Sequence, residues 1–260
     1  MQLNDVEACV LEAIARGDSI DAAALLFLLR RYRATLRDDL GDAVGRALAI
    51  ALDAPDRDAT VVERAAWLTL FVEASALTDD ERLPLAIRDL VTELRAGWAS
   101  PSIEQAAAAV GSCLEAARLD SASSLAADAV DELERIIGRA YRPGADLGGA
   151  LDQVRAAFTL LVAYGISGRL PYAMLAEELI QRSRAAASSE FVVACETARV
   201  LSRLAALHDD TGYRAAAVIV PAADYRADAR RLLAAQAAEA LRRGAAGAIY
   251  GVALLELESG

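Results

Sequence analysis

The stretch Leu36-Arg37-Asp38-Asp39 recurs 41 positions later as Leu77-Thr78-Asp79-Asp80, and each copy separates two segments with helical periodicity. Glu73-Ala74, just before the second copy, matches Glu115-Ala116 at a spacing of 42. A fixed period of about 40 residues is typical of arrays of helical hairpins. The spacing therefore predicts a repeated unit that consists of one helix, a short polar turn and a second helix.

Apolar residues recur at i, i+3, i+4 and i+7 along almost every segment, whereas the strict alternation of a β-strand is absent. Aromatic residues make up 5% of the chain, so the core must be built from Ala, Leu, Val and Ile, of which Ala and Leu favour helices most. The chain is predicted to be all-α and to form a single domain over residues 1–260. The expected helices lie near 5–16, 20–36, 39–53, 61–77, 83–98, 103–119, 122–140, 151–165, 172–186, 190–207, 223–242 and 245–258.

These helices group into hairpins, and one helix is left over at each end of the chain. The five complete hairpins cover 20–53, 61–98, 103–140, 151–186 and 190–242. An open solenoid gives no reason to leave a spare helix at each end. We therefore expect helices 5–16 and 245–258 to pair as a sixth hairpin and to close the array into a ring.

Three helix starts carry the pattern of a capping box, in which the cap side chain and the residue three positions later bind exposed backbone N–H groups. The patterns are Asn4-x-x-Glu7, Thr60-x-x-Glu63 and Ser102-x-x-Gln105. They predict that a helix begins directly after the first residue of each pattern.

All 27 basic residues of the 260-residue chain are arginine, against 38 Asp and Glu residues and a formal net charge of −11. Lysine is absent, and His208 is the single histidine. A chain without lysine cannot form a Schiff base, anchor pyridoxal phosphate or supply the lysine of a P-loop, and sites that need two histidines are excluded. We expect no cofactor and no metal site.

Charge and cysteine usage also indicate the partners and the compartment. The negative balance repels phosphate backbones and no segment concentrates the arginines, so nucleic acid is not an expected partner. The longest uncharged stretches, 156–168 and 244–255, are shorter than the roughly 20 apolar residues of a spanning helix. Cys9, Cys113 and Cys195 are far apart and suit free thiols, and the acidic N-terminus differs from a signal peptide. A cytoplasmic protein without a membrane span is expected.

The stretch Leu201-Ser202-Arg203-Leu204-Ala205-Ala206-Leu207-His208-Asp209-Asp210-Thr211-Gly212-Tyr213 resembles a hairpin in the toroid portion of thioredoxin-fused, glycosidase-like proteins. The segment from Tyr164 to Tyr172 is similar in character. On these turns the chain resembles the α/α-toroid, or six-hairpin, superfamily, over roughly half of its length. The resemblance implies a ring whose inner helices are 20–36, 61–77, 103–119, 151–165, 190–207 and 245–258.

This superfamily holds glycosidases, sugar epimerases, terpene cyclases, protein prenyltransferases and lanthionine cyclases, so the fold alone assigns no activity. The zinc enzymes need a ligand set with His and Cys that this chain cannot assemble, and the epimerases need paired histidines. Triterpene cyclases have a DxDD run and aromatic walls, which are absent here. Glycoside cleavage needs only two carboxyl groups and is the one chemistry of the superfamily for which the chain keeps residues.

Acidic pairs lie in three predicted turns, at Asp38-Asp39, Asp79-Asp80 and Asp209-Asp210. Asp38-Asp39-Leu40-Gly41-Asp42 matches the DDxxD pattern that binds magnesium diphosphate in isoprenoid synthases, but no second metal motif follows it. Because the other pairs lie in the same kind of turn, we interpret the acids as caps of the following helices. His208 is interpreted as a surface histidine near a helix C-terminus rather than as a catalytic base.

A hydrolase of this fold would place its carboxyl groups near one rim, on the inner helices or on the loops that enter them. The acids available there are Glu63, Asp152, Glu190 and Glu196. We select Glu190 and Glu196 as the catalytic pair in that case. Glu196 and Arg199 are spaced i, i+3 on an apolar helix, which predicts a salt bridge between them. Trp67 and Tyr250 lie within inner helices and could floor a pocket, although aromatic residues there are more often core.

Scarce aromatic residues and short connections disfavour a sugar-cleaving cleft, so the sequence favours a toroid without catalytic activity. We expect it to bind a small apolar ligand or a protein partner in its central depression. The candidate ligand-binding residues are Trp67, Asp152, Arg155, Arg199 and Tyr250. The alternatives are a carbohydrate-active hydrolase and an open helical-repeat scaffold. Two carboxyl groups that face one solvent-filled pocket would favour the hydrolase, and packing of helices 5–16 and 245–258 against each other would exclude the open scaffold.

Overall fold

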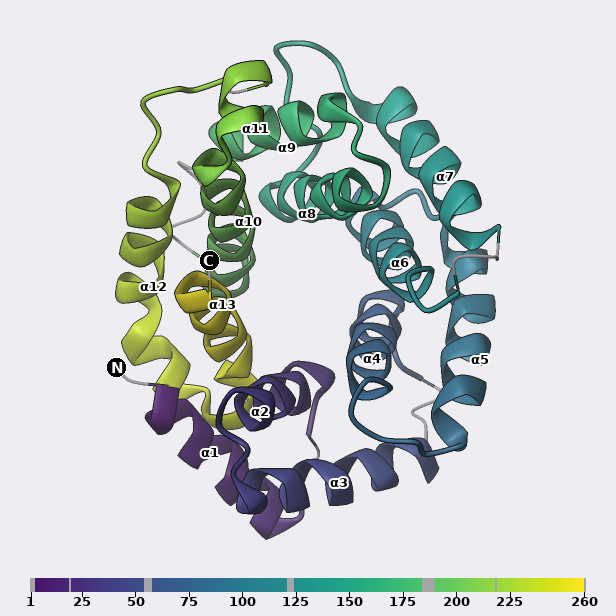
Figure 1. The fold of residues 1–260 in the computed structure, drawn as a ribbon, viewed down its shortest axis with the longest axis vertical. Coiled ribbons are helices and arrows are strands. Elements are labelled where there is room, and N and C mark those ends of the chain that lie inside the picture. Colours follow the sequence, from purple (N-terminus) through teal and green to yellow (C-terminus); the bar gives the residue numbers. More distant parts are fainter. Residues whose placement is uncertain are drawn as a thin grey trace.

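The computed structural model describes residues 3–18, 20–53, 58–120, 124–183, 190–217 and 219–259. Within these ranges the chain forms thirteen α-helices, one short 3-10 helix and no β-strand, as the sequence predicts. The helices are arranged in two concentric rings (Figure 1). Because the chain alternates between the rings, the six inner helices all run in the same direction.

Both rings contain six long helices. The inner ring consists of α2 (Ala22–Thr35), α4 (Val61–Ala74), α6 (Ile103–Ala116), α8 (Ala150–Ser167), α10 (Phe191–Asp209) and α13 (Ala248–Ser259). The outer ring consists of α1 (Leu3–Arg16), α3 (Asp38–Asp53), α5 (Arg82–Gly97), α7 (Leu125–Ala140), α9 (Leu170–Ser183) and α12 (Tyr225–Arg242). Every predicted inner helix is present, with ends within a few residues of those expected.

The core fills the space between the rings and is built mainly from Ala, Leu and Val side chains. On the inner helix α6, nine of fourteen residues are buried, whereas the outer helix α7 buries four of its sixteen. Inner helices are thus covered on most sides and outer helices on one stripe, which explains the apolar sequence of the former. The three cysteines are free thiols, as predicted. None of the described helices has both the length and the apolar character needed to span a bilayer.

Two of the predicted capping boxes begin helices. Thr60 Oγ1 accepts the Glu63 N–H at 3.2 Å, and Glu63 Oε2 accepts the Thr60 N–H at 2.7 Å, which completes the box of α4. Ser102 Oγ accepts the Gln105 N–H at 3.3 Å at the start of α6. The Gln105 side chain instead accepts a hydrogen bond from Ser100 Oγ, so this second box is half formed.

The capping box predicted at Asn4 and Glu7 is wrong, because both residues lie inside α1. Asn4 Oδ1 accepts a hydrogen bond from Arg31 Nη2 at 2.9 Å, and Glu7 Oε2 accepts one from Arg31 Nε at 2.8 Å. Arg37 also binds Glu7. These two side chains tie α1 to α2 and to the turn that follows it.

The ring closes where α13 packs against α2, and α1 packs on this junction. The predicted last helix is divided into the 3-10 helix η1 (Gly244–Gly247) and α13. Gly251 permits the close approach, since a Cβ atom there would lie 2.7 Å from ring atoms of Phe27 on α2. Helices α1 and α13 pack against each other as expected, which excludes the open scaffold.

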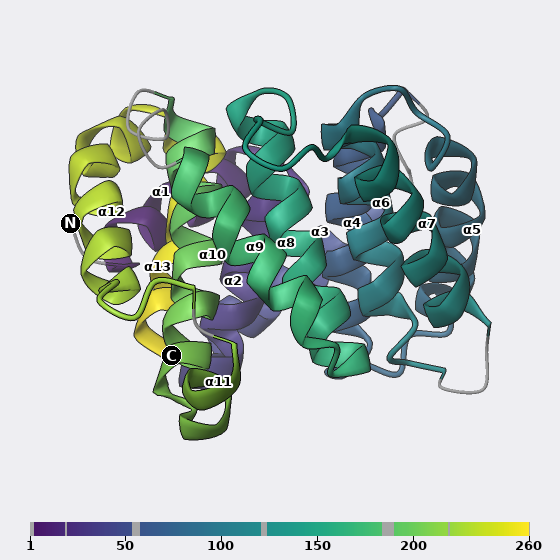
Figure 2. The same cartoon turned by 90° about the horizontal axis from the view of Figure 1, so that it is seen from above.

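Between α10 and α12 the chain forms α11 (Thr211–Ala216), a short helix that the sequence did not predict. Figure 2 shows α11 on the side of the ring at which α13 ends. The segment after α11 is held by Glu177 on α9, a fully buried carboxylate. Glu177 accepts the N–H groups of Ile219 and Val220, each at 3.1 Å, and the Tyr225 hydroxyl at 2.6 Å. Three donors satisfy this buried charge and fasten the segment to α9.

His208 lies beside the same carboxylate, and the expectation that it is a surface residue is wrong. Its side chain is 11% exposed, and its Nε2 lies 3.3 Å from Glu177 Oε1. The imidazole packs edge-on against Tyr225, with 4.8 Å between ring centroids, and Tyr213 on α11 contacts it as well. His208 does occupy the last turn of α10, as predicted, but α11 and α12 cover it.

Candidate functional site

Arginine and carboxylate side chains line the centre of the inner ring. Arg30 on α2 donates to both oxygens of Glu73 on α4, with Nε 3.1 Å from Oε2, and its Nη1 donates to Glu256 Oε1 on α13 at 2.7 Å. Glu256 also accepts from Nη2 of Arg199 on α10 at 2.9 Å. Four inner helices are thus joined by side chains that are mostly buried.

Arg203 on α10 connects these central side chains to the inner helices α8 and α6. Its guanidinium stacks over the Phe158 ring of α8, 4.0 Å from the ring centroid, and comes within 3.9 Å of Glu115 on α6. Glu115 in turn accepts a hydrogen bond from Thr69 Oγ1 on α4 at 2.9 Å. Because α8 stands between α6 and α10, the approach of Arg203 to Glu115 crosses the inner face of α8.

All six inner helices therefore contribute to one layer of side chains around the centre, which we call the central belt. It consists of Arg30, Thr69, Glu73, Glu115, Phe158, Arg199, Arg203 and Glu256. Burial alone would raise the pKa of Glu256, but Arg199, Arg203 and Arg30 outweigh burial and lower this pKa to about 2. Glu256 is therefore ionised at neutral pH and cannot serve as a general acid there.

Arg203 differs from the other arginines of the central belt. Burial opposes the charge of Arg30 and Arg199 as well, but their carboxylate partners raise the pKa of both guanidinium groups above the ordinary value. Burial lowers the pKa of Arg203, and the attraction of Glu256 and Glu115 does not offset it. Within the described part of the chain, the nearest carboxylate to Arg203 is Glu115 at 3.9 Å, which is beyond hydrogen-bond distance.

A cavity of about 580 Å³ lies where the inner helices end, and we call it the central cavity. The mostly buried Arg30 and Glu256 belong to its deeper wall, and the exposed Arg33 and Ser259 to its mouth. The lining residues are Arg30, Arg33, Ala34, Glu73, Ser202, Arg203, Ala206, Leu255, Glu256 and Ser259. Seven of these ten side chains are polar or charged.

A second ion-pair cluster lies toward the opposite end of the ring, where the inner helices begin. Arg155 on α8 donates to Glu196 on α10, with Nη2 2.8 Å from Oε1, and also binds Glu104 in the first turn of α6. Asp152 accepts the Glu104 N–H through Oδ1 and the Gly149 N–H through Oδ2, both at 2.8 Å. Asp152 therefore caps α6 and α8 at once, and it holds the starts of these two helices together.

The structure brings together Arg155 and Glu196, two of the residues selected from the sequence, but it separates Glu196 from Arg199. The salt bridge predicted between Glu196 and Arg199 is wrong, because Glu196 binds Arg155 on α8 and Arg199 binds Glu256 on α13. An inner helix lies on each side of α10, so the Glu196 side chain reaches α8 and the Arg199 side chain reaches α13. Spacing along one helix cannot reveal partners of this kind.

The other selected residues do not line the central cavity. Trp67 is partly buried and packs against Phe71, with 5.7 Å between ring centroids. Tyr250 is buried, and burial raises the pKa of its hydroxyl. Glu190 is exposed directly before α10, and Glu63 closes the capping box of α4. The roles proposed for these residues in ligand binding or hydrolysis stay predictions.

Of the residues in the central belt, only Arg199 was predicted from the sequence to bind a ligand. Glu73 and Glu115 did carry a signal, because they begin the Glu-Ala dipeptide that recurs 42 positions apart. Equivalent positions of successive repeats face the same way, so a charge repeated on otherwise apolar inner helices indicates the centre of the ring. Arg30 and Glu256 belong to no such repeat, and their pairing depends on ring closure.

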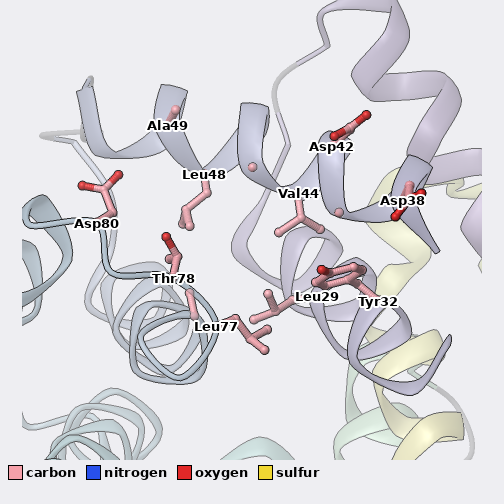
Figure 3. A pocket seen from close by; sticks show the side chains of 13 residues that line it. Leu29, Tyr32, Asp38, Asp42, Val44, Leu48, Ala49, Leu77, Thr78 and Asp80 are labelled. Carbon is pink, nitrogen blue, oxygen red and sulfur yellow. The ribbon is translucent and has the colours of Figure 1, made fainter. Parts of the chain in front are cut away.

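An outer pocket of about 340 Å³ lies between α2, α3 and the turn after α4 (Figure 3). Val44 and Leu48 on α3 point across it toward Leu29 and Leu77. The outer members of the predicted DDxxD pattern, Asp38 and Asp42, also line this pocket. Asp39 instead binds Arg37, with 2.6 Å between Oδ2 and Nη2. Among the described residues, no three His, Cys, Asp or Glu side chains converge in a way that could hold a metal ion.

The paired turn acids lie at helix starts, as predicted. Asp210 Oδ1 accepts the Tyr213 N–H at 2.7 Å and caps α11. Asp80 Oδ1 accepts the Arg82 N–H at 2.9 Å, and hydrogen bonds from the Arg82 side chain and backbone lower the pKa of Asp80 to about 2. The Asp38-Asp39 pair occupies the first turn of α3, where negative charge stabilises a helix.

Comparison with known proteins finds no matching protein family and no matching curated protein. Among solved structures, the α-1,6-mannanase GH76A of Salegentibacter sp. HEL1_6 matches 99% of this chain and 99% of its own, with a TM-score of 0.62 and 12% identity. An inactive variant of that enzyme in complex with α-1,6-mannotetrose matches 100% of this chain and 99% of its own, with a TM-score of 0.65 and 11% identity. A further inactive variant, in complex with α-1,6-mannotriose, matches 99% of both chains with a TM-score of 0.63 and 11% identity.

Identities this low show the fold and leave the activity open. The match extends over both rings, well beyond the turn sequences that first carried the resemblance. The chain is therefore an α/α toroid of six helical hairpins, the fold of the GH76 α-1,6-mannanase.

Proposed function

We propose that the protein binds a small polar ligand, with the size and chemistry of a short carbohydrate, in the central cavity. The observation that carries this proposal is the lining, in which seven of ten side chains are polar or charged. The cavity volume of about 580 Å³ falls within the range of small-molecule sites, ~300–1,000 Å³. The solved relatives that bind α-1,6-mannotetrose and α-1,6-mannotriose support a carbohydrate.

The chemistry of the central belt favours binding over cleavage. Glycoside hydrolysis needs one carboxyl group that is protonated at the working pH and a second that is ionised. The pKa of Glu256 is lowered to about 2, so this residue cannot be the proton donor. Both oxygens of Glu73 accept hydrogen bonds from the Arg30 guanidinium, so this carboxylate is held in an ion pair. The belt is suited to hydrogen-bond the hydroxyl groups of a ligand without attacking it.

Calorimetric titration with α-1,6-mannotetrose and a panel of neutral mono- and disaccharides tests this proposal. Ala206→Trp places an indole in the central cavity and should abolish binding. The matched variant Ala49→Trp fills the outer pocket of Figure 3 and should leave the affinity unchanged. Binding that survives Ala206→Trp but not Ala49→Trp would contradict the proposal, and a failure of neutral and charged sugars alike to bind would favour a protein partner instead.

A carbohydrate-active hydrolase is the second candidate, and acids at the opposite end of the ring favour it. Burial raises the pKa of Asp21, which caps α2, and the charge of Glu63 adds to this rise. Glu190 and Glu196 are the pair selected from the sequence. Incubation with α-1,6-mannotetrose, followed by chromatography of the products, distinguishes the candidates. Turnover that disappears in both Glu190→Gln and Glu196→Gln would establish the hydrolase, whereas binding without turnover supports the leading proposal.

A further inference from the structure

The central cavity and the belt beneath it carry an excess of positive charge, although the whole protein has a net charge of −11. The arginines are Arg30, Arg33, Arg199 and Arg203, and the carboxylates are Glu73, Glu115 and Glu256. Four positive groups thus face three negative ones, which leaves a local charge of +1. A pocket whose charge opposes that of its protein concentrates ligands of the opposite sign.

Two arginines at this cavity keep hydrogen-bond donors unused. Arg203 has its nearest carboxylate at 3.9 Å, and Arg33 Nη1 lies 3.8 Å from Glu73 Oε2, so both distances exceed that of a hydrogen bond. Each guanidinium has five N–H donors in a rigid plane. Both side chains line the same cavity, and the structure shows no hydrogen bond from either within the described residues.

The contacts of Arg203 also determine which of its atoms can bind a ligand. Its guanidinium stacks on Phe158, with 4.0 Å from the guanidinium carbon to the ring centroid, so one face of the plane is covered. The edge with its N–H groups has no hydrogen-bond partner among the described residues, and 31% of the side chain is exposed. That edge is the part of arginine that binds carboxylate or phosphate with two parallel hydrogen bonds. Nearby Arg199 and Arg30 repel the charge of Arg203, and burial lowers its pKa, so an anion would relieve an unfavourable state.

We infer that the ligand of the central cavity carries an oxyanion, a carboxylate or a phosphate, which binds the edge of Arg203 with help from Arg33. The inference rests on the proposed function and specifies its ligand as an acidic or phosphorylated sugar rather than a neutral one. The bound anion balances the excess charge of the central cavity and the belt taken together, to which Arg33 contributes. The sugar hydroxyls then face the polar lining, which includes Ser202 and Glu256.

Titration of the intact protein with four probes separates the parts of this inference. The probes are glucose, glucose 6-phosphate, glucuronate and inorganic phosphate. We expect both charged sugars to bind at least about tenfold more tightly than glucose, and to lose this advantage at high salt, because the added interaction is electrostatic. We expect inorganic phosphate alone to bind more weakly than glucose 6-phosphate, since it lacks the contacts of the sugar.

Variants assign the effect to the two arginines. Arg203→Gln should lower the affinity for the charged sugars relative to that for glucose, measured in the same variant, by about tenfold or more. Arg203→Lys keeps the charge but not the paired hydrogen bonds, so it should restore the preference only in part. Arg88→Gln, on the exposed side of α5, is the matched control and should have no effect. Thermal unfolding of each variant verifies that it is folded.

The possible outcomes distinguish failure of the anion inference from failure of the proposed sugar-binding function. Equal affinity for glucose and its charged derivatives would overturn the inference and leave the proposed function standing. Failure of every sugar to bind, charged or neutral, would overturn both. Inorganic phosphate that binds as tightly as glucose 6-phosphate would support the anion site but contradict a sugar ligand. A preference for charged sugars that survives both Arg203→Gln and Arg33→Gln would show that the anion binds elsewhere.

Discussion

Glu196 and Arg199 stand one turn apart on α10, yet each binds a different neighbouring helix. Glu196 Oε1 lies 2.8 Å from Arg155 Nη2 on α8, and Arg199 Nη2 lies 2.9 Å from Glu256 Oε1 on α13. The two ion pairs hold α10 on both sides. The centre of the toroid is therefore organised by contacts between helices, and most of its charged groups have a structural partner before any ligand arrives.

Glu256 has two such partners, and its replacement should be strongly destabilising. Glu256→Gln leaves Arg30 and Arg199 buried without their shared carboxylate, so the free energy of unfolding should fall by about 3 kcal/mol. Urea denaturation followed by circular dichroism measures this change. Glu258→Gln, an exposed position on the same helix, should alter stability by less than about 0.5 kcal/mol. Similar losses in the two variants would contradict the role given to Glu256.

Stability should also depend on pH through Glu256. Its pKa is lowered from 4.5 to about 2 in the folded protein, so folding favours the ionised form. The stabilisation is complete above the unfolded pKa of 4.5 and is lost as the pH falls toward 2, with a total of about 3 kcal/mol. The difference in unfolding free energy between the natural protein and Glu256→Gln should therefore shrink from about pH 5 to about pH 3. A difference that stays constant over this interval would argue against the assignment.

Replacement of Arg203 should affect the stability of the protein differently from replacement of Arg30. Because burial lowers the pKa of its guanidinium, the folded state disfavours this charge. Arg203→Met removes the charge and keeps an unbranched, flexible side chain that can contact Phe158, so stability should be unchanged or higher by up to about 2 kcal/mol. Arg30→Met removes the partner of two carboxylates and should lower the melting temperature. If both variants were equally destabilised, Arg203 would be a structural residue rather than one kept for a ligand.

The junction that closes the ring should be sensitive to a single methyl group. Gly251→Ala would place a Cβ atom 2.7 Å from the Phe27 ring, and the overpacking should lower stability by about 1–3 kcal/mol. A Cβ atom at Gly45 on α3 would meet no other atom within 4 Å, so Gly45→Ala should raise stability by about 0.5–1 kcal/mol through helix propensity. Differential scanning calorimetry of both variants should show shifts of opposite sign.

Glu177 should protect the backbone amides of the segment that follows α11 from hydrogen exchange. Glu177→Gln replaces a carboxylate that accepts the N–H groups of Ile219 and Val220, so exchange of these two amide hydrogens should accelerate. Hydrogen-exchange mass spectrometry measures the effect. Glu178→Gln is the neighbouring control, because Glu178 binds Tyr141 and should leave the exchange of this segment unchanged. Unaltered exchange in Glu177→Gln would show that other contacts hold the segment.

The elements that could be predicted are those specified within one helix or one turn. The box of Thr60 and Glu63 formed because its donors and acceptors are three residues apart and meet in any helix that starts there. The box at Asn4 did not form because α1 already begins at Leu3 and Arg31, from another helix, binds both side chains. His208 was misplaced because the segment that covers it lies in a later part of the chain.

The sequence by itself determined the all-α class, the inner helices and the closure of the ring, since apolar periodicity and a repeat of about 40 residues are local properties that each hairpin carries. The tertiary structure alone decided what the centre contains. Arg30 and Glu256 are 226 positions apart and meet only because α13 packs beside α2. Periodicity tells which face of a helix points inward, but the residue opposite depends on how far neighbouring helices slide along each other, which packing of the whole ring sets.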